Sequence, residues 1–327
     1  MTKLNTLQYG SVEELSSLNH FSLNALRANN AFDAYTLEYK TLYNYKKIKT
    51  FSFSKEGFMA LFLELDGEIA ISKGESEAII EGAKLYEKIG GTIVWLGLTQ
   101  EGSVDFSALE SSDVTFAFVS SYVMDSFVKI DLSDLQKYNE LKIVSNASAN
   151  FDAQSDIIYF DNYKLTGFNS SGVLLFNEDE FELLPVGVID SIAVKICLDA
   201  LKEQKFNTTL KGLFIEKLQT TFGDDIFFFV EPALTLEYTL HFGLKNLKAR
   251  ELIRTLALSK IYISNGEGCS LGLSRPSRVI QEMGFSEQKS REALSLSFCE
   301  ALDEERVDAI VHLLFQKYRQ IKLLNDE

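Results

Sequence analysis

Short runs of almost entirely apolar residues recur along the first part of the chain. They cover residues 69–72, 92–96, 115–119, 141–144, 157–160 and 172–176. A strand with one face in water alternates apolar and polar residues, whereas a strand covered on both faces is apolar throughout. The runs therefore predict the strands of a sheet that is buried on both of its faces.

Helical patterns separate several of these apolar runs. The clearest covers residues 188–204, where positions 189, 192, 193, 196, 197 and 200 are apolar at the spacing of one helix face. Strands that alternate with helices form βαβ units, in which the strands run parallel. The sequence therefore predicts an α/β fold in which helices flank a mostly parallel sheet.

The order of the predicted elements changes after about residue 206. A helical pattern at 210–222 is followed by strand-like runs at 225–230 and 234–240, a helix at 248–258, a strand at 260–264 and a final helix at 303–324. This order is typical of a smaller α+β unit. We expect a large α/β domain at residues 1–205, including a divergent N-terminal segment, and a small α+β domain at 206–327.

The charge of the chain narrows the classes of partner. It has 32 Lys and Arg against 47 Asp and Glu, a formal net charge of −15. Nucleic acids and anionic membranes are bound through basic patches, so we expect neither as a partner. The N-terminus lacks the apolar core of a signal peptide, and three cysteines do not suggest a disulfide scaffold. We therefore expect a cytoplasmic protein, and the three scattered histidines predict no metal site.

The candidate chemistry lies in motifs that follow one another along the chain. GEGCSLGLSRPS, QEMG, ALSLSFC and LDEERVD occur near the C-terminus. ISKGESEAIIEGAKLYEKIGGTIVWL, GSVDFSAL and DIIYFDNYKLTGFNSSGVLLF occur upstream. Cys269 lies in a loop of glycine and serine, and Lys164 follows a predicted strand.

In this order and spacing the motifs resemble those of the cysteine desulfurases, which belong to the class V aminotransferase group. The C-terminal signature of that family runs roughly G-S-A-C-x-S-x-x-x-x-P-S, then L-G, then S-I-R-F-S-L-G, then T-x-E-E-I-D. The resemblance extends from about residue 51 onward. It implies fold type I of the pyridoxal phosphate (PLP) proteins, a homodimer, and PLP as the cofactor.

The same resemblance assigns two catalytic positions. Lys164 stands where the family lysine holds PLP as a Schiff base, and Cys269 stands where a cysteine takes sulfur from the substrate as a persulfide. A Schiff-base lysine must give up its proton readily, and a sulfur acceptor must reach the thiolate state. Both residue types therefore suit the implied chemistry.

The positions that contact the cofactor in this family carry other residue types here. Ser145 and Ser148 stand at the Asp and Gln of V-D-A-x-Q, and Ser76 stands at the histidine that stacks on the ring. Asp161 and Tyr163 stand at the S-x-H that holds the phosphate. Because the pyridine nitrogen needs an acid and a carboxylate repels a phosphate, these replacements indicate a degraded cofactor site.

Further contacts of the cofactor and substrate differ as well. Ser295 stands at the arginine that pairs with the substrate carboxylate, and residues 187–188 are Gly-Val where the family has Gly-Thr. The glycine-rich T-S-G-x-T-E-S turn is reduced to SFSKEGFMA, whose one glycine is Gly57. Arg278 has the pattern of an ordinary helix-surface charge, and Glu75 that of an acid favoured at a helix start.

Three hypotheses about function follow from this sequence. In the first, the chain has the desulfurase fold, has lost PLP catalysis and acts as a binding or structural partner, for example of a sulfur-transfer protein or a family relative. In the second, it is an active PLP-dependent cysteine desulfurase or related lyase that uses Lys164 and Cys269. In the third, Cys269 alone relays sulfur without PLP.

Overall fold

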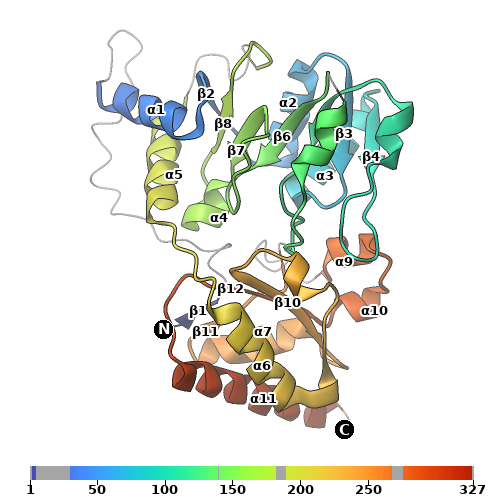
Figure 1. Ribbon diagram of the computed structural model, residues 1–327, viewed down its shortest axis with the longest axis vertical. Helices are drawn as coiled ribbons and strands as arrows, with labels where there is room; N and C mark the ends of the chain where they lie inside the picture. Colours follow the sequence, from blue (N-terminus) through green and yellow to red (C-terminus); the bar gives the residue numbers. More distant parts are fainter. Residues whose placement is uncertain (1, 5–29, 139, 182–188, 267–274, 326–327) are drawn as a thin grey trace.

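The chain has two units, which are connected in sequence by the segment after α5 (Figure 1). The computed structural model describes residues 2–4, 30–138, 140–181, 189–266 and 275–325. The larger unit is built on a seven-stranded sheet, and the smaller unit on a three-stranded sheet with a two-stranded sheet beside it.

The seven strands of the large unit lie in the order β2-β8-β7-β6-β5-β3-β4. Their bounds are β2 (Lys47–Phe51), β3 (Glu68–Ser72), β4 (Ile93–Leu96), β5 (Val114–Phe118), β6 (Lys142–Asn146), β7 (Ile157–Phe160) and β8 (Gly172–Phe176). Neighbouring strands from β4 to β7 are parallel, and β8 is antiparallel to both β7 and β2. The predicted α/β class, with a mostly parallel sheet, is confirmed.

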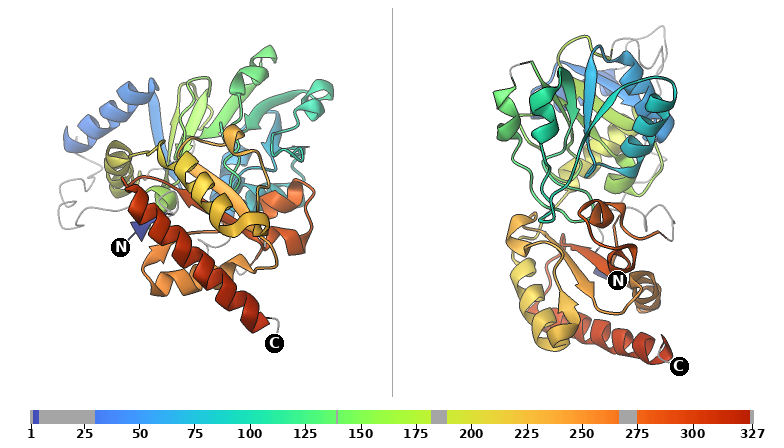
Figure 2. Two further views of the ribbon diagram at one scale, coloured as in Figure 1. Left: turned by 60° about the horizontal axis from the view of Figure 1, so that its bottom comes forward. Right: turned by 90° about the vertical axis from the view of Figure 1, so that its right-hand side faces the viewer.

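Helices cover both faces of this sheet, which explains why its strands are apolar throughout (Figures 1 and 2). The helices of the unit are α1 (Asn30–Tyr43), α2 (Lys55–Glu64), α3 (Glu77–Lys88), α4 (Asn162–Thr166) and α5 (Ser191–Glu203), with 3₁₀ helices at Ser107–Ser111 and Leu132–Lys137. Phe58 and Ile79 of α2 and α3 pack on one face, and Tyr39 and Cys197 of α1 and α5 pack on the other.

The small unit is α+β, as its order of elements predicts. Its strands are β9 (Ile226–Phe227), β10 (Thr239–Leu244) and β12 (Ala293–Ser297), which form an antiparallel sheet, and β1 (Thr2–Lys3) and β11 (Ile261–Tyr262), which pair in parallel. Its helices are α6 (Leu210–Phe222), α7 (Ala249–Leu258), α9 (Arg278–Glu282), α10 (Glu287–Ser290) and α11 (Glu304–Asn325), with 3₁₀ helices at Gly223–Asp225 and Pro232–Leu234. Val307 and Leu314 of α11 are buried.

Several boundaries differ from those that the sequence pattern predicts. The run at 225–230 yields a strand of only two residues, and the strand expected at 234–240 begins instead at Thr239, because a 3₁₀ turn occupies Pro232–Leu234. Ile192 is 44% exposed, since the buried stripe of α5 is centred on its neighbours Ala193 and Val194. β1 pairs with β11, so residues 2–3 lie in the small unit although the sequence analysis grouped them with the large one.

The two units share one hydrophobic cluster at their junction. It joins Val119 and Ile143 of the large unit to Tyr238, Ile280 and Met283 of the small unit. All five side chains are at most 6% exposed. This continuous core supports a fixed arrangement of the units, because separating them would expose buried apolar surface to water.

Ionic contacts across the junction are centred on Arg278 of α9. Its Nε donates to Glu77 Oε2 at 3.0 Å, and its terminal nitrogens donate to the backbone oxygens of Lys73 and Glu75. Lys73 Nζ in turn donates to Glu282 Oε2 at 2.9 Å. Arg278 therefore joins α9 to the turn between β3 and α3, and it is not the ordinary surface charge that the sequence suggested.

We expect Arg278→Ala to lower the free energy of unfolding by about 2 kcal/mol, because it leaves half-buried carbonyl oxygens without their charged donor. Arg291→Ala is the matched control. Arg291 pairs with Glu287 one helical turn away, and exposed pairs of that kind contribute about 0.5 kcal/mol or less. Urea unfolding of both variants measures the difference, and equal losses would contradict the assignment.

Candidate functional site

Polar and ionisable residues gather where the parallel strands end. Glu75 follows β3, Ser120 follows β5, Asn146 ends β6, and Asp161 and Lys164 follow β7. The carboxyl ends of parallel strands share one edge of a sheet, which is where α/β proteins commonly bind ligands. This edge, on the side of the sheet toward the small unit, is the candidate site (Figure 1).

Lys164 is positioned by the short helix α4. Asp161 caps its start, since the carboxylate accepts from the amides of Tyr163 and Lys164 at 3.0 and 3.3 Å. Gly167 ends it with φ of +77°, a left-handed conformation that glycine adopts without strain. The Lys164 side chain is only 12% exposed, and its Nζ lies 3.1 Å from Met124 Sδ and 4.0 Å from Asp161 Oδ2.

Glu75 is the most deeply buried carboxylate at this edge, with 1% exposure. Its Oε1 accepts from the amide of Ser120 at 2.6 Å, and its Oε2 accepts from the Tyr159 hydroxyl at 3.1 Å. Burial raises the pKa of Glu75, while the hydrogen bonds from Ser120 and Tyr159 and the charge of Lys164 act in the opposite direction.

Of the residues predicted to contact the cofactor, two lie at the turn that carries Lys164 and two lie buried on other elements. Ser148 Oγ accepts from the amide of Asp161 at 2.7 Å, which holds Ser148 beside the Lys164 turn, and Tyr163 lies half-buried in that turn. Ser76 precedes α3 and Ser145 lies within β6, and both are almost fully buried. Within the described ranges, the hydroxyls of Ser76 and Ser145 have no hydrogen-bond partner.

These residues do not fit PLP. The cofactor needs an acid at its pyridine nitrogen, but Ser145 and Ser148 are neutral, and both carboxylate oxygens of Glu75 already have donors. Its phosphate needs backbone amides or cations. At the position that the resemblance gives to the phosphate contact, the Asp161 carboxylate accepts from two such amides itself.

The reduced glycine turn likewise satisfies its own amides. Ser54 caps α2, and its Oγ accepts from Gly57 N at 3.2 Å and from Ser52 Oγ at 3.0 Å. Glu56 adds a negative charge to the first turn of the helix. A phosphate at this helix start would find the amide of Gly57 already bonded to Ser54. It would also be repelled by the carboxylate of Glu56.

The position that the resemblance gives to the substrate-binding arginine lies inside a buried hydrogen-bonded group. Ser295 is 1% exposed, and its hydroxyl donates to the backbone oxygen of Asp125 at 3.1 Å. His241 Nδ1 lies 3.0 Å from the same hydroxyl, and Ser277 Oγ donates to Asp125 Oδ2 at 2.7 Å. The group links β10 and β12 of the small unit to the turn after β5.

Two sequence predictions lie outside the described residues. Cys269 belongs to the segment 267–274, and the Gly-Val pair belongs to 182–188. Gly266, the last described residue before the cysteine, is so close to Asp125 that an added Cβ would lie 2.3 Å from the carboxylate carbon. Lys164 and Cys269 remain predictions as catalytic residues.

Sequence reasoning missed Met124 as a neighbour of Lys164, and it missed the burial of Glu75 at the same edge of the sheet. Glu75 was interpreted as an acid at a helix start, whereas it is buried and directed to Ser120 and Tyr159. The signal that could have found it is its place directly after a fully apolar strand, at the edge where polar residues of parallel strands meet. Met124 gave no such signal, because it comes from a loop whose path depends on the small unit.

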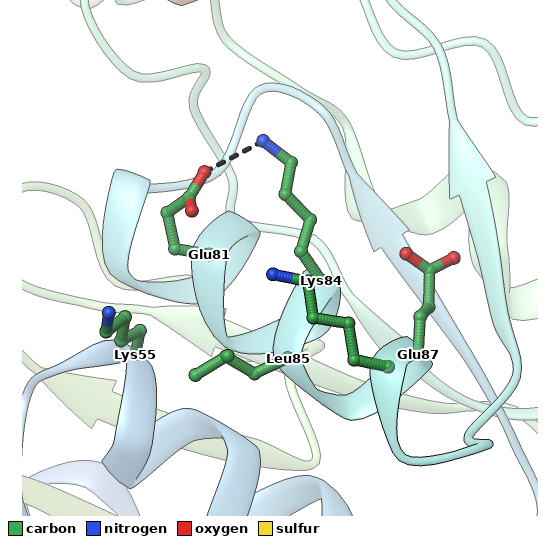
Figure 3. Close-up of a pocket in the computed structure, with 6 residues that line it drawn as sticks. Lys55, Glu81, Lys84, Leu85 and Glu87 are labelled. Carbon is green, nitrogen blue, oxygen red and sulfur yellow. Dashed lines mark hydrogen bonds and ion pairs between the residues drawn. The ribbon is translucent and has the colours of Figure 1, made fainter.

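A hollow of about 430 Å³ lies elsewhere on the surface, between α2 and α3 (Figure 3). It is lined by Lys55, Glu81, Lys84, Leu85, Glu87 and Lys88. Lys84 donates to Glu81 at 2.8 Å across its rim. None of the residues around Lys164 lines it, so the hollow is separate from the candidate site. Among the described residues, no group of three or more His, Cys, Asp or Glu is placed to hold a metal ion.

Comparison with solved structures identifies the fold. A NifS-like protein matches with a TM-score of 0.73 and 14% identity, over 96% of this chain and 98% of its own. A NifS-like protein from Rickettsia africae matches with a TM-score of 0.73 and 16% identity, over 98% and 99%. A cysteine desulfurase from Thermococcus onnurineus matches with a TM-score of 0.70 and 12% identity, over 96% and 94%. No protein-family model and no curated protein matches the sequence.

The chain therefore has the fold of the NifS-like proteins and cysteine desulfurases, over nearly its whole length. The predicted kinship of fold is confirmed. Fold alone does not carry an activity, which depends on the residues of the site. No helix in the described ranges has the length and apolar character needed to cross a bilayer.

Proposed function

We propose that this protein keeps the cysteine desulfurase fold without PLP catalysis and serves as a binding or structural partner. The observation that carries the proposal is the hydrogen bonding of Asp161. Its carboxylate stands at the predicted phosphate contact and accepts hydrogen bonds from the amides of Tyr163 and Lys164. A bound phosphate would have to displace this carboxylate or lie beside it, and either arrangement is unfavourable.

The pyridine side of the site supports the same proposal. A carboxylate that stabilises the protonated ring nitrogen must have an oxygen directed at it. Glu75, the most deeply buried carboxylate of this edge, has one oxygen bonded to Ser120 and the other to Tyr159. Loss of the acid and of the phosphate contacts would remove both the electron sink and the anchor of the cofactor.

We expect the purified protein to be colourless and to show no aldimine absorbance after PLP is added, because the site lacks these contacts. Borohydride reduction followed by peptide mapping should find no PLP adduct on Lys164. An adduct on the exposed Lys88 under forcing conditions would serve as the positive control for the chemistry. A visible band trapped on Lys164 would overturn the proposal and favour an active desulfurase that uses Lys164 and Cys269.

We also propose a homodimer, in the cytoplasm. Two large apolar side chains support the dimer: Phe168 is 46% exposed and Ile192 is 44% exposed. They belong to neighbouring segments, because Asn162 Nδ2 donates to the backbone oxygens of Ser171 and Ala193. Exposed apolar side chains from adjoining segments are a common feature of subunit interfaces. The low cysteine count supports the cytoplasm.

A further inference from the structure

We propose that the turn at residues 123–128 is a conformational switch that couples the docking of the small unit to the exposure of Lys164. While the small unit is docked, the turn is held in a strained conformation in which Met124 covers the amine of Lys164. Opening of the junction lets the turn relax and uncovers the amine. The inference goes beyond the proposed function, because it concerns access to Lys164 and does not depend on whether PLP binds.

The turn contains two strained residues. Asp125 and Phe127 have φ of +63° and +61°, in the left-handed region. A Cβ makes this region unfavourable, above all for a bulky residue such as phenylalanine. Two backbone bonds close the turn itself, from the amide of Val123 to the oxygen of Val128 at 2.9 Å and from the amide of Phe127 to the oxygen of Val123 at 3.0 Å. Strained residues persist only where the surrounding structure fixes them as well.

Contacts at both strained residues come from the small unit. The Ser277 hydroxyl, at the start of α9, donates to Asp125 Oδ2 at 2.7 Å. The Ser295 hydroxyl of β12 donates to the backbone oxygen of Asp125 at 3.1 Å, and the amide of Leu236 donates to the backbone oxygen of Phe127 at 2.9 Å. The three donor residues are at most 4% exposed. Docking of the small unit therefore supplies buried hydrogen bonds that offset the strain.

The side chain of Asp125 also fits closely against the backbone of the small unit. An added Cβ at Gly266 would lie 2.3 Å from its carboxylate carbon, so a glycine there leaves room for the carboxylate. Ser277 and Gly266 thus contact the same group from two segments of the small unit, and Asp125 is 7% exposed. Undocking would remove both contacts together.

The residue before Asp125 reaches the candidate site of the large unit. Met124 Sδ lies 3.1 Å from Lys164 Nζ, and the amide of Met124 donates to the backbone oxygen of Gly74 at 2.9 Å. Met124 is 3% exposed, and the side chain of Lys164 is 12% exposed. Because Met124 and Asp125 are adjacent, a change of φ at Asp125 reorients one relative to the other. The contact with Lys164 therefore depends on the bonds that hold Asp125.

The test measures acylation of lysines by acetic anhydride in the full chain without PLP, followed by peptide mass spectrometry. The exposed Lys88 is the reference for the reagent. Half-buried Lys211 of the small unit, whose Nζ donates to Thr235 Oγ1 at 2.7 Å, reports general loosening of the fold. We expect Ser277→Ala to raise the acylation rate of Lys164 about tenfold relative to Lys88, because losing a hydrogen bond to a charged group shifts an equilibrium by about that factor. The rate at Lys211 should stay unchanged.

Ser286→Ala is the matched control for Ser277→Ala. Each serine caps a short helix of the small unit, and the hydroxyls lie 3.2 and 3.1 Å from the amides that they cap. Ser277 also donates to Asp125, whereas Ser286 caps α10 away from the turn. Loss of a helix cap alone should therefore leave the acylation rate of Lys164 at its native value in Ser286→Ala.

Two substitutions of Asp125 separate strain from the loss of a contact. Asp125→Ala and Asp125→Gly both remove the carboxylate, but alanine is strained at a φ of +63° and glycine is not. We expect Lys164 to be acylated faster in the alanine variant than in the glycine variant. If greater flexibility alone exposed the amine, the glycine variant would react faster, and that order would overturn the inference.

The inference also fails if Lys164 of Ser277→Ala reacts within about twofold of the native rate, or if Lys164 and Lys211 gain reactivity equally. If Ser277→Ala does not fold, the order of the two Asp125 variants decides. These readouts contain no PLP, so a failure of the switch leaves the absorbance test of the proposed function unaffected.

Discussion

Lowering the pH from 7 to 4 should reduce the free energy of unfolding by about 3 kcal/mol through His241 alone. The imidazole is 1% exposed, and burial lowers its pKa from 6.5 to about 3. Below pH 6.5 the imidazole of His241 binds a proton in the unfolded chain, whereas it stays neutral in the folded chain down to about pH 3. Stability from this residue is therefore complete above pH 6.5 and falls as the pH decreases toward 3.

The hydrogen bonds of His241 explain why its neutral form is favoured. The Ser295 hydroxyl donates to the backbone oxygen of Asp125, so it accepts from His241 Nδ1–H at 3.0 Å. This leaves Nε2 as the unprotonated nitrogen, and it has no partner in the part of the chain that the structure describes. A proton at Nε2 would place a charge in the buried core with no acceptor for its N–H.

The measurement compares urea unfolding of the native protein and His241→Asn at several pH values. The asparagine amide can donate near the Nδ1 position but does not titrate, and the carboxylates that both proteins share cancel in the difference. We expect the native protein to be more stable at pH 7 and the advantage to shrink toward pH 4. Parallel stability curves would show that His241 is protonated in the folded state or does not contribute.

Gly57→Ala should destabilise the protein by about 2–3 kcal/mol, although alanine favours helices. A Cβ at position 57 of α2 would lie 1.8 Å from the backbone oxygen of Ser52 and 2.8 Å from its carbonyl carbon. Both are backbone atoms, so no side-chain rotation relieves the overlap. The oxygen of Ser52 also accepts from the amide of Ser54 at 2.8 Å, which restricts its movement.

Gly212→Ala in α6 is the control for this prediction, with the opposite sign. Nothing lies within 4 Å of a Cβ at that position, and the residue is exposed. Alanine there should stabilise the helix by up to about 1 kcal/mol through its higher helix propensity. Melting temperatures that rise for both variants would contradict the close contact between Gly57 and Ser52.

Local patterns were sufficient for elements whose signal repeats within one segment. The almost entirely apolar run of β3 and the apolar helix face of α5 predicted both elements correctly, because burial on two faces and on one face leaves different periodicities. The pattern could not show that β8 runs against its neighbours, since a strand buried on both faces looks the same in either direction. It also misplaced β10, because a 3₁₀ turn interrupts the apolar run.

The features of the candidate site can likewise be separated into those that the sequence predicts and those that depend on tertiary contacts. The sequence by itself determined the fold class and the place of Lys164 after a buried strand, since both follow from motif order and local pattern. Only the tertiary structure decided that Glu75 is buried and bonded to Ser120 and Tyr159, that Arg278 joins the two units, and that Ser295 lies in a group with His241. Each of these contacts joins residues far apart in the chain, and their charges and hydrogen bonds acquire partners only when the strands are assembled.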